Sequence, residues 1–196
     1  MTSPSTPPAT VPLVRDARPA DVAAICAFGE EHVRPHYVPL IGAEAADAQV
    51  RDWWNATYVA AGVEAGCVVV ADVGGACVGV GQRGRYGADH VVHKLYVDPA
   101  FRGHGLGPRL IDALVRRLPP EVTDLWVEHV AANTRAAAFY EREGFTVERV
   151  DPSPSGHEGL ATVWRRRRLP GAPSATRPPD ETTTPRDRAG VADEAS

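Results

Sequence analysis

VVHKLYVDPAFRGHGLGPRLIDALVRRL, residues 91–118, is the stretch that decides the fold. Residues 91–97 are rich in β-branched and aromatic side chains and stop at Asp98-Pro99, which is typical of a strand that ends in a turn. From Leu106 onward the apolar residues lie three or four apart, which predicts one face of a helix. Glycines at 103, 105 and 107 lie where that helix begins. Their uncovered N–H groups and the helix dipole predict an anion site, most naturally for phosphate.

Two common phosphate-binding loops fit this stretch poorly. The Walker loop requires a lysine followed by serine or threonine, and the only lysine of the chain is Lys94. A dinucleotide fingerprint places its first glycine directly after a strand, but five residues separate Val97 from Gly103, and Pro108 follows the last glycine. The pattern that remains is Arg102-x-x-Gly105-x-Gly107 after a strand.

Outward from this stretch, the hydrophobic pattern predicts the other elements. Alternating or continuous apolar runs predict strands over 11–17, 67–73, 76–85, 89–97, 122–130, 145–150 and 160–169. Helical spacing predicts helices over 22–31, 45–61, 106–118 and 136–143. Two prolines predict an irregular segment over 33–42. The strand–helix–strand succession around residues 106–118 predicts one parallel pair in an otherwise antiparallel sheet.

A second motif follows the next strand: Glu128, Asn133, Tyr140 and then Gly144-Phe145. Asn133 opens a helix and Tyr140 lies seven residues later on the same face, so both face one groove. Together the two motifs, over residues 91–147, closely resemble the GNAT superfamily of acyl-CoA-dependent N-acetyltransferases. The resemblance implies an α/β (α+β) fold with a mixed, mostly antiparallel six- to seven-stranded sheet and helices on both faces. It also places acyl-CoA between strands 91–97 and 122–130.

The resemblance implies acetyl-CoA as cosubstrate and assigns its contacts. The backbone of residues 95–97 would pair with the pantetheine arm, and residues 103–108 would cradle the pyrophosphate. The implied cofactor-binding residues are Leu95, Tyr96, Val97, Arg102, Gly103, His104, Gly105, Leu106, Gly107, Pro108, Asn133 and Tyr140. Pro108 departs from the usual basic or polar residue and removes one N–H donor. Arg102 is open to two interpretations: a phosphate contact, or a solvated loop arginine.

The catalytic residues implied by the resemblance are Tyr140 and Glu128. Tyr140 can hydrogen-bond the departing sulfur and donate to it, and Glu128 can take the proton of the amine, directly or through water. His93, His129 and water remain alternative bases. In a strand, His129 points away from Glu128. Because no cysteine lies near the motif, the amine is expected to attack acetyl-CoA directly in a ternary complex.

Two classes of function stay open: an N-acetyltransferase acting on a primary amine, and a non-catalytic acyl-CoA-binding sensor or regulatory module of the same fold. Five kinds of acceptor stay open: a small amine, an amino acid, an antibiotic, a protein N-terminus and a lysine. His32, His36 and Tyr37, in the segment after the first helix, are expected to wall the acceptor pocket.

Composition narrows the other partners and the domain layout. A net charge of −4 argues against a nucleic-acid partner. Three widely spaced cysteines, without a metal-type pair, predict free thiols in a cytoplasmic protein with no metal. No apolar run approaches the about 18 residues of a membrane span, so the protein is expected to be soluble. A homodimer is possible. Arg165 to Arg168 are expected to be solvated residues at the exit of an edge strand. Proline-rich residues 1–12 and 170–196 are expected to be disordered, which leaves residues 13–169 as one acetyltransferase domain.

Overall fold

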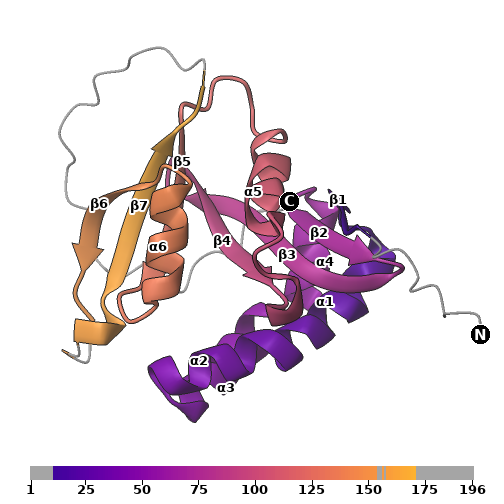
Figure 1. Ribbon diagram of the computed structural model, residues 1–196, viewed down its shortest axis with the longest axis horizontal. Helices are drawn as coiled ribbons and strands as arrows, with labels where there is room; N and C mark the ends of the chain where they lie inside the picture. The colour runs from indigo at the N-terminus through magenta and orange to yellow at the C-terminus, as the bar shows by residue number, and fades with distance from the viewer. Residues whose placement is uncertain (1–10, 154–155, 157, 171–196) are drawn as a thin grey trace, which may run out of the picture.

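The structure, a computed structural model, describes residues 11–153, 156 and 158–170. One seven-stranded sheet forms its centre, with the strand order β1-β2-β3-β4-β5-β7-β6 (Figure 1). The strands are β1 (Leu13–Asp16), β2 (Val68–Val73), β3 (Ala76–Tyr86), β4 (Asp89–Val97), β5 (Asp124–Val130), β6 (Thr146–Asp151) and β7 (Thr162–Arg168). Among the strands that the structure describes, only β4 and β5 pair in parallel. The structure confirms the mixed, mostly antiparallel sheet that the sequence predicts.

Helices cover both faces of the sheet, as predicted. They are α1 (Val22–Phe28), the π-helix η2 (Gly29–Val33), α2 (Arg34–Ile41), α3 (Ala43–Trp53), α4 (Ala56–Glu64), α5 (Leu106–Val115) and α6 (Thr134–Arg142). Short 3-10 turns are η1 (Pro19–Asp21), η3 (Pro99–Phe101) and η4 (Glu158–Leu160). The buried residues of α5 and α6 belong to one core, and those of α1, η2, α3 and α4 belong to a second core on the opposite face. Across the described part of the chain, no helix is long and apolar enough to cross a membrane.

The parallel pair β4 and β5 separates soon after it forms. Its register runs from His90 opposite Leu125 to Val92 opposite Val127 and then stops. On its other side β4 stays paired with β3 as far as Val97, opposite Gly79. Figure 1 shows the consequence: β1 to β4 lie in one half of the sheet, and β5, β7 and β6 in the other. β4 and β5 are therefore not paired with each other at their carboxyl ends, and we call this break in the pairing the gap.

The predicted irregular segment over 33–42 is wrong, because that region is helical. Pro35 lies in the first turn of α2, where a missing N–H interrupts no intrahelical bond, and Pro39 interrupts one bond inside α2. The π-helix η2 joins α1 to α2 without a break. A Cβ on Gly29 of η2 would come within 2.8 Å of the Trp54 side chain, so this turn is shaped by a contact with a residue distant in sequence.

The predicted helix over 45–61 is in fact two helices. Asn55 separates α3 from α4. Its side chain accepts a hydrogen bond from the Tyr58 N–H at 2.9 Å and so caps the start of α4. The break turns Trp54 into the core, where it is 2% exposed, while Trp53 stays 37% exposed. Trp54 is therefore a core residue, and Trp53 lies at the rim of the core.

The prediction that Arg165 to Arg168 lie at an edge strand is also wrong. β7 lies between β5 and β6, and β6 is the edge. Arg165 is buried and donates to the His129 Nε2 at 3.1 Å, while Arg166 pairs with Glu148 at 2.9 Å and Asp124 at 3.4 Å. The last hairpin turns back and inserts its second strand into the sheet, and the order of strands along the chain does not show this.

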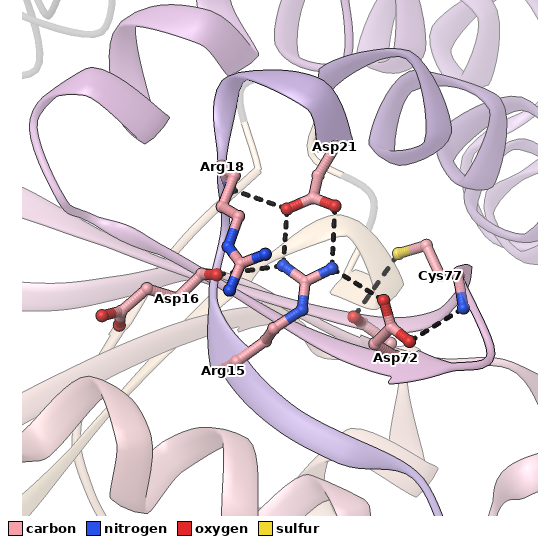
Figure 2. Close-up of polar contacts among 8 residues, drawn as sticks. Arg15, Asp16, Arg18, Asp21, Asp72 and Cys77 are labelled. Carbon is pink, nitrogen blue, oxygen red and sulfur yellow. Dashed lines mark hydrogen bonds and ion pairs between the residues drawn. The ribbon is translucent and has the colours of Figure 1, made fainter.

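Three side chains, Arg15, Asp21 and Asp72, form what we call the Arg15 cluster at the other edge of the sheet (Figure 2). The Arg15 guanidinium of β1 contacts both carboxylate oxygens of Asp21, at 2.6 and 2.9 Å, and the Asp72 carboxylate of β2 at 2.7 Å. These hydrogen bonds to Arg15, together with backbone N–H groups, lower the pKa of both aspartates. The Arg15 cluster ties the start of α1 to the sheet. Residues 1–10 and 171–196, most of the segments expected to be disordered, lie outside the described residues.

Candidate active site

The glycine-rich loop has the backbone conformation that an anion cradle needs. Gly103 and Gly105 adopt φ values of 80° and 71°, in the left-handed region that favours glycine. Gly105 caps α5 without any side-chain hydrogen bond, so no side chain covers the first N–H groups of the helix. A Cβ on Gly103 or Gly105 would meet nothing within 4 Å, which leaves open space beside those donors. His104 is exposed beside them.

The other loop residues contribute in different ways. Leu106 is 2% exposed and packs in the core, so its backbone alone is available. A Cβ on Gly107 would come within 2.8 Å of the Phe139 ring, so this glycine permits close packing of α6 on α5. Pro108 lies in the first turn of α5, where its missing N–H costs no helical bond but removes one donor.

Arg102 fits neither of its two sequence interpretations in full. Its Nε donates to the Val97 carbonyl at 2.9 Å, so the side chain braces the end of β4 against the loop. Burial and the nearby Arg135 lower the pKa of Arg102. Two guanidinium groups that repel each other here would both be stabilised by an anion. Arg135, in the first turn of α6, was not among the residues predicted from the sequence.

The edge of β4 that faces the gap carries no strand partner among the described residues after Val92. Residues 95–97 pair with β3 on one side only, opposite Gly81, Val80 and Gly79. Their backbone groups on the gap side are therefore placed to pair with an extended ligand, in the way that an added strand would.

Tyr140 lies on α6 in a buried aromatic setting and is 7% exposed. Its ring stacks on the His129 ring, with centroids 6.0 Å apart, and meets the Phe145 ring edge-on at 5.6 Å. Burial, together with the nearby Tyr37, raises the pKa of Tyr140 well above its usual value, so the phenol keeps its proton near neutral pH.

Glu128 and three tyrosines converge on the gap from four different elements. The Tyr37 hydroxyl of α2 and the Tyr96 hydroxyl of β4 lie 2.9 Å apart. Burial is the main cause that raises the pKa of each, and the carboxylate of Glu128 on β5 raises both further. Tyr140 adds to the rise at Tyr96. We call Tyr37, Tyr96, Tyr140 and Glu128 the tyrosine cluster.

Asn133 connects α6 to α2. Its Oδ1 accepts from the Ala136 N–H at 3.1 Å and caps α6, while its Nδ2 lies 3.2 Å from the His36 Nε2. Burial, Arg102 and Arg135 lower the pKa of His36, so its imidazole is neutral and can accept this hydrogen bond. His36 and Tyr37 thus attach α2 to both sides of the gap. His32 lies farther back, 3.9 Å from the Asp98 carboxylate at the end of β4.

The structure separates the alternative bases. His129 has both ring nitrogens engaged: Nε2 accepts from Arg165 at 3.1 Å, and Nδ1 lies 3.0 Å from the Val130 carbonyl. A proton on Nε2 would put an imidazolium against a guanidinium, and the pKa of His129 is lowered mainly by burial. His93 packs against Gly84 of β3, and burial lowers its pKa as well. Glu128 points to the opposite face of β5 from His129, as predicted.

Comparisons with known proteins agree with this arrangement. Residues 64–147 match the family model for the acetyltransferase (GNAT) domain. The chain is 33% identical over 126 residues to mycothiol acetyltransferase of Propionibacterium freudenreichii subsp. shermanii. This match covers 60% of the chain and 36% of that protein. It is 42% identical over 67 residues to ribosomal protein bS18-alanine N-acetyltransferase of Salmonella typhimurium, covering 32% of the chain and 45% of that protein.

A solved structure has the same fold. PaiA N-acetyltransferase from Thermoplasma acidophilum, in complex with coenzyme A, superposes with a TM-score of 0.67 at 13% identity, over 81% of this chain and 99% of that one. The chain spans less than half the length of the curated relatives it matches. The fold and the matched segment define an acetyltransferase domain. Residues 64–147 of the chain belong to the GNAT superfamily of acetyltransferases.

Proposed function

We propose that this chain transfers an acetyl group from acetyl-CoA to a primary amine, by direct attack in a ternary complex. The observation that carries the proposal is the open backbone edge of β4 at residues 95–97, which runs from the glycine loop at 103–105 to the tyrosine cluster. The named acetyltransferases that the chain resembles support it. We assign the activity to residues 13–169.

The residues present fit acetyl-CoA. The uncapped start of α5, with Gly103 and Gly105 beside it, offers N–H donors to a pyrophosphate. Arg102 and Arg135 add positive charge there. The gap-side backbone of residues 95–97 offers donors and acceptors to the amide-containing arm. Bound acetyl-CoA would supply an activated acetyl thioester at the tyrosine cluster.

Tyr140 then acts on the sulfur side of the reaction. Its pKa lies far above the usual thiol value of about 8.5, so the phenol holds its own proton and donates a hydrogen bond to the developing thiolate. Glu128 acts on the amine side, as the proton acceptor. The pKa of the Cys77 thiol is raised by burial to about 11, and burial also raises that of Cys26, so neither is prepared to form an acyl-enzyme.

The acceptor is a primary amine of a small molecule or a peptide, and an α-amine needs less help from a base because its usual pKa is near 8. Among the residues that the structure describes, no group of side chains could hold a metal ion, and the three cysteines are free thiols. The free thiols support a reducing, cytoplasmic location.

The test has two stages. Calorimetry should show acetyl-CoA binding to the full chain, and a thiol reagent should report CoA release when an amine is added. The amines are an alanine-initiated peptide, the same peptide with a blocked α-amine, a blocked peptide containing lysine, and an aliphatic diamine. At least one free amine should gain an acetyl group by mass spectrometry. Binding without transfer to any amine would identify an acyl-CoA-binding module instead, and no binding would end the proposal.

A further inference from the structure

We propose that Tyr37 and Tyr96 form the subsite that receives the acceptor amine and passes its proton to Glu128. The inference rests on the proposed acetyl transfer and names two further residues for it. Tyr37 lies in a segment where the sequence predicts only a pocket wall, and Tyr96 was predicted to contribute only its backbone.

The geometry of the pair leaves capacity for a third group. The two hydroxyl oxygens lie 2.9 Å apart and either can be the donor. Two hydroxyls carry two hydrogens and four lone pairs, and one mutual bond uses one of each. One O–H hydrogen and several lone pairs therefore stay available. An amine nitrogen and a carboxylate oxygen are groups that complete such a pair, because the amine offers hydrogens and the carboxylate accepts one.

The surroundings hold the two phenols in place. The Tyr96 ring packs edge-on against the buried Trp54, with centroids 5.4 Å apart. The Tyr37 ring lies against His36, with centroids 5.3 Å apart, and His36 is bonded to Asn133 at the start of α6. One oxygen comes from β4 and the other from a helix anchored beyond β5. The pair therefore spans the gap in which acetyl-CoA is placed.

Both phenols stay protonated at neutral pH because burial, and to a lesser extent the carboxylate of Glu128, raises the pKa of each. They are therefore not bases, but each can accept a proton at oxygen while giving up its own. Glu128, which follows the last residue of β5 that pairs with β4, is close enough to raise the pKa of both, and we take its carboxylate as the end of the path. Tyr140 influences Tyr96 and is influenced by Tyr37, so the sulfur side lies next to the same pair.

The transfer then balances. The amine nitrogen forms the new N–C bond, and the C–S bond breaks with its electron pair on sulfur. The proton that leaves nitrogen goes to one phenol oxygen, and the proton of the pair goes to Glu128, so both phenols end neutral. Sulfur departs as thiolate, hydrogen-bonded by Tyr140, and takes a proton from solvent. Glu128 returns its proton to solvent, and the net products are an N-acetyl amide and the CoA thiol.

The experiment compares Tyr37→Phe, Tyr96→Phe and the double variant with a matched control, Tyr58→Phe. Tyr58 belongs to the same aromatic layer, where its ring lies under Lys94, 4.3 Å from the ammonium nitrogen, but its hydroxyl is not part of the pair. Each single variant should lower kcat about 10- to 100-fold, because a positioned proton acceptor is lost. The double variant should lose no more than the worse single one, because the pair acts as one unit. The control should match wild type.

Two further readouts separate this role from a structural one. Acetyl-CoA affinity by calorimetry should change less than twofold in every variant. In ligand-free protein labelled with ¹³C at the tyrosine ring, the Tyr96 resonance should titrate at lower pH in Tyr37→Phe, since Tyr37 raises the pKa of Tyr96. Rates are also measured at increasing fractions of deuterium in the solvent. The wild-type rate should fall along a curve, because more than one proton moves in the relay. The Tyr37→Phe rate should fall along a straight line, because only one proton moves there.

Multiplicative losses in the double variant, unchanged kcat in either single variant, or an equal loss in Tyr58→Phe would each overturn the inference. If wild type binds acetyl-CoA and acetylates an amine, and both Tyr37→Phe and Tyr96→Phe do so at the full rate, the subsite is refuted but the proposed function is not. Wild type that binds no acetyl-CoA, or acetylates none of the four amines, refutes the proposed function and this inference with it.

Discussion

The Arg15 cluster and the tyrosine cluster are both groups of polar side chains that come from several elements, but the pKa values of the aspartates in the first and of the tyrosines in the second are shifted in opposite directions. In the Arg15 cluster, a guanidinium faces two carboxylates whose pKa values it lowers, so all three groups are charged at neutral pH. In the tyrosine cluster, burial raises the pKa of three phenols, which keep their protons beside one carboxylate. The first arrangement fixes two strands and a helix. The second keeps movable protons where a reaction needs them, and substitutions should separate these two roles.

The largest expected effect belongs to Tyr140→Phe. Loss of the hydrogen bond to the leaving sulfur should lower kcat about 100- to 1000-fold, while acetyl-CoA affinity stays within twofold of wild type. CoA release and calorimetry measure the two quantities. Tyr86→Phe, which removes a 37% exposed phenol far from the gap, is the control and should change neither. Full turnover in Tyr140→Phe would remove this residue from the mechanism.

Glu128→Gln should lower kcat about 10- to 100-fold at pH 7, because the amide cannot take the proton of the amine. The loss should shrink as the pH rises past about 8, where a free α-amine has already lost its extra proton. A pH series of CoA release rates measures this. A deficit that stays constant from pH 7 to 9.5 would show that Glu128 takes only the proton released as the N–C bond forms, and full turnover in Glu128→Gln would remove this residue from the mechanism.

Arg15→Met should affect stability instead. It leaves Asp21 and Asp72 without their cation, and we expect the free energy of unfolding to fall by about 1–2 kcal/mol at pH 7. The pKa values of both aspartates are lowered in the folded state, so this stabilisation is complete above their usual value near 3.8 and is lost as pH falls below it. Denaturant unfolding at pH 7 and pH 3 measures the change.

The control for that substitution is Arg117→Met. Arg117 pairs with Asp16, but both side chains are about half exposed, 54% and 51%, so the loss should stay below about 0.5 kcal/mol. Equal losses at the two arginines would mean that the Arg15 cluster is no more than a surface ion pair. Acetyl transfer should be unchanged in both variants at a temperature where they remain folded.

The smallest expected effect concerns Lys94, a buried amine without a carboxylate partner among the described residues. Lys94 is 4% exposed, donates to the Gln82 Oε1 at 2.6 Å and lies under Trp54 and Tyr58; burial lowers its pKa to about 7. Lys94→Met should raise the free energy of unfolding by about 1 kcal/mol at pH 6 to 7. Between pH 7 and about 10.5 the unfolded chain binds a proton that the folded chain does not, so wild-type stability rises and the advantage of Met shrinks. An advantage that grows with pH would contradict this.

The sequence predicts the sheet and the glycine loop well because their signals are local. Alternating apolar residues mark each strand to within about two residues, and Gly103 and Gly105 need the left-handed backbone that only glycine adopts easily. The placement of β7 between β5 and β6 is not local, and neither is the π-helix η2, which depends on Trp54 packing against Gly29. The capping residue Asn55 was a readable signal for the break between α3 and α4.

The candidate site divides in the same way. Tyr140, Glu128 and the loop follow from motifs, whereas the hydroxyl of Tyr96 depends on which way the residue faces after the register shift near Gln82. The contact between His36 and Asn133 joins residues 97 positions apart, and no spacing rule predicts it. Arg135 follows Asn133 by two positions, and basic residues in the first turn of that helix were a signal that could have identified it.

The short parallel pairing of β4 with β5 gives the sheet an edge in its own middle. Because register ends at Val92, every second amide hydrogen of residues 93–97 points to the gap side, where no described strand protects it, although strands lie on both flanks. In deuterated water these amides should exchange as fast as those of an outer strand, while their neighbours in β3 exchange slowly. An added acetyl-CoA molecule should slow them selectively, as if the missing strand had been supplied from solution.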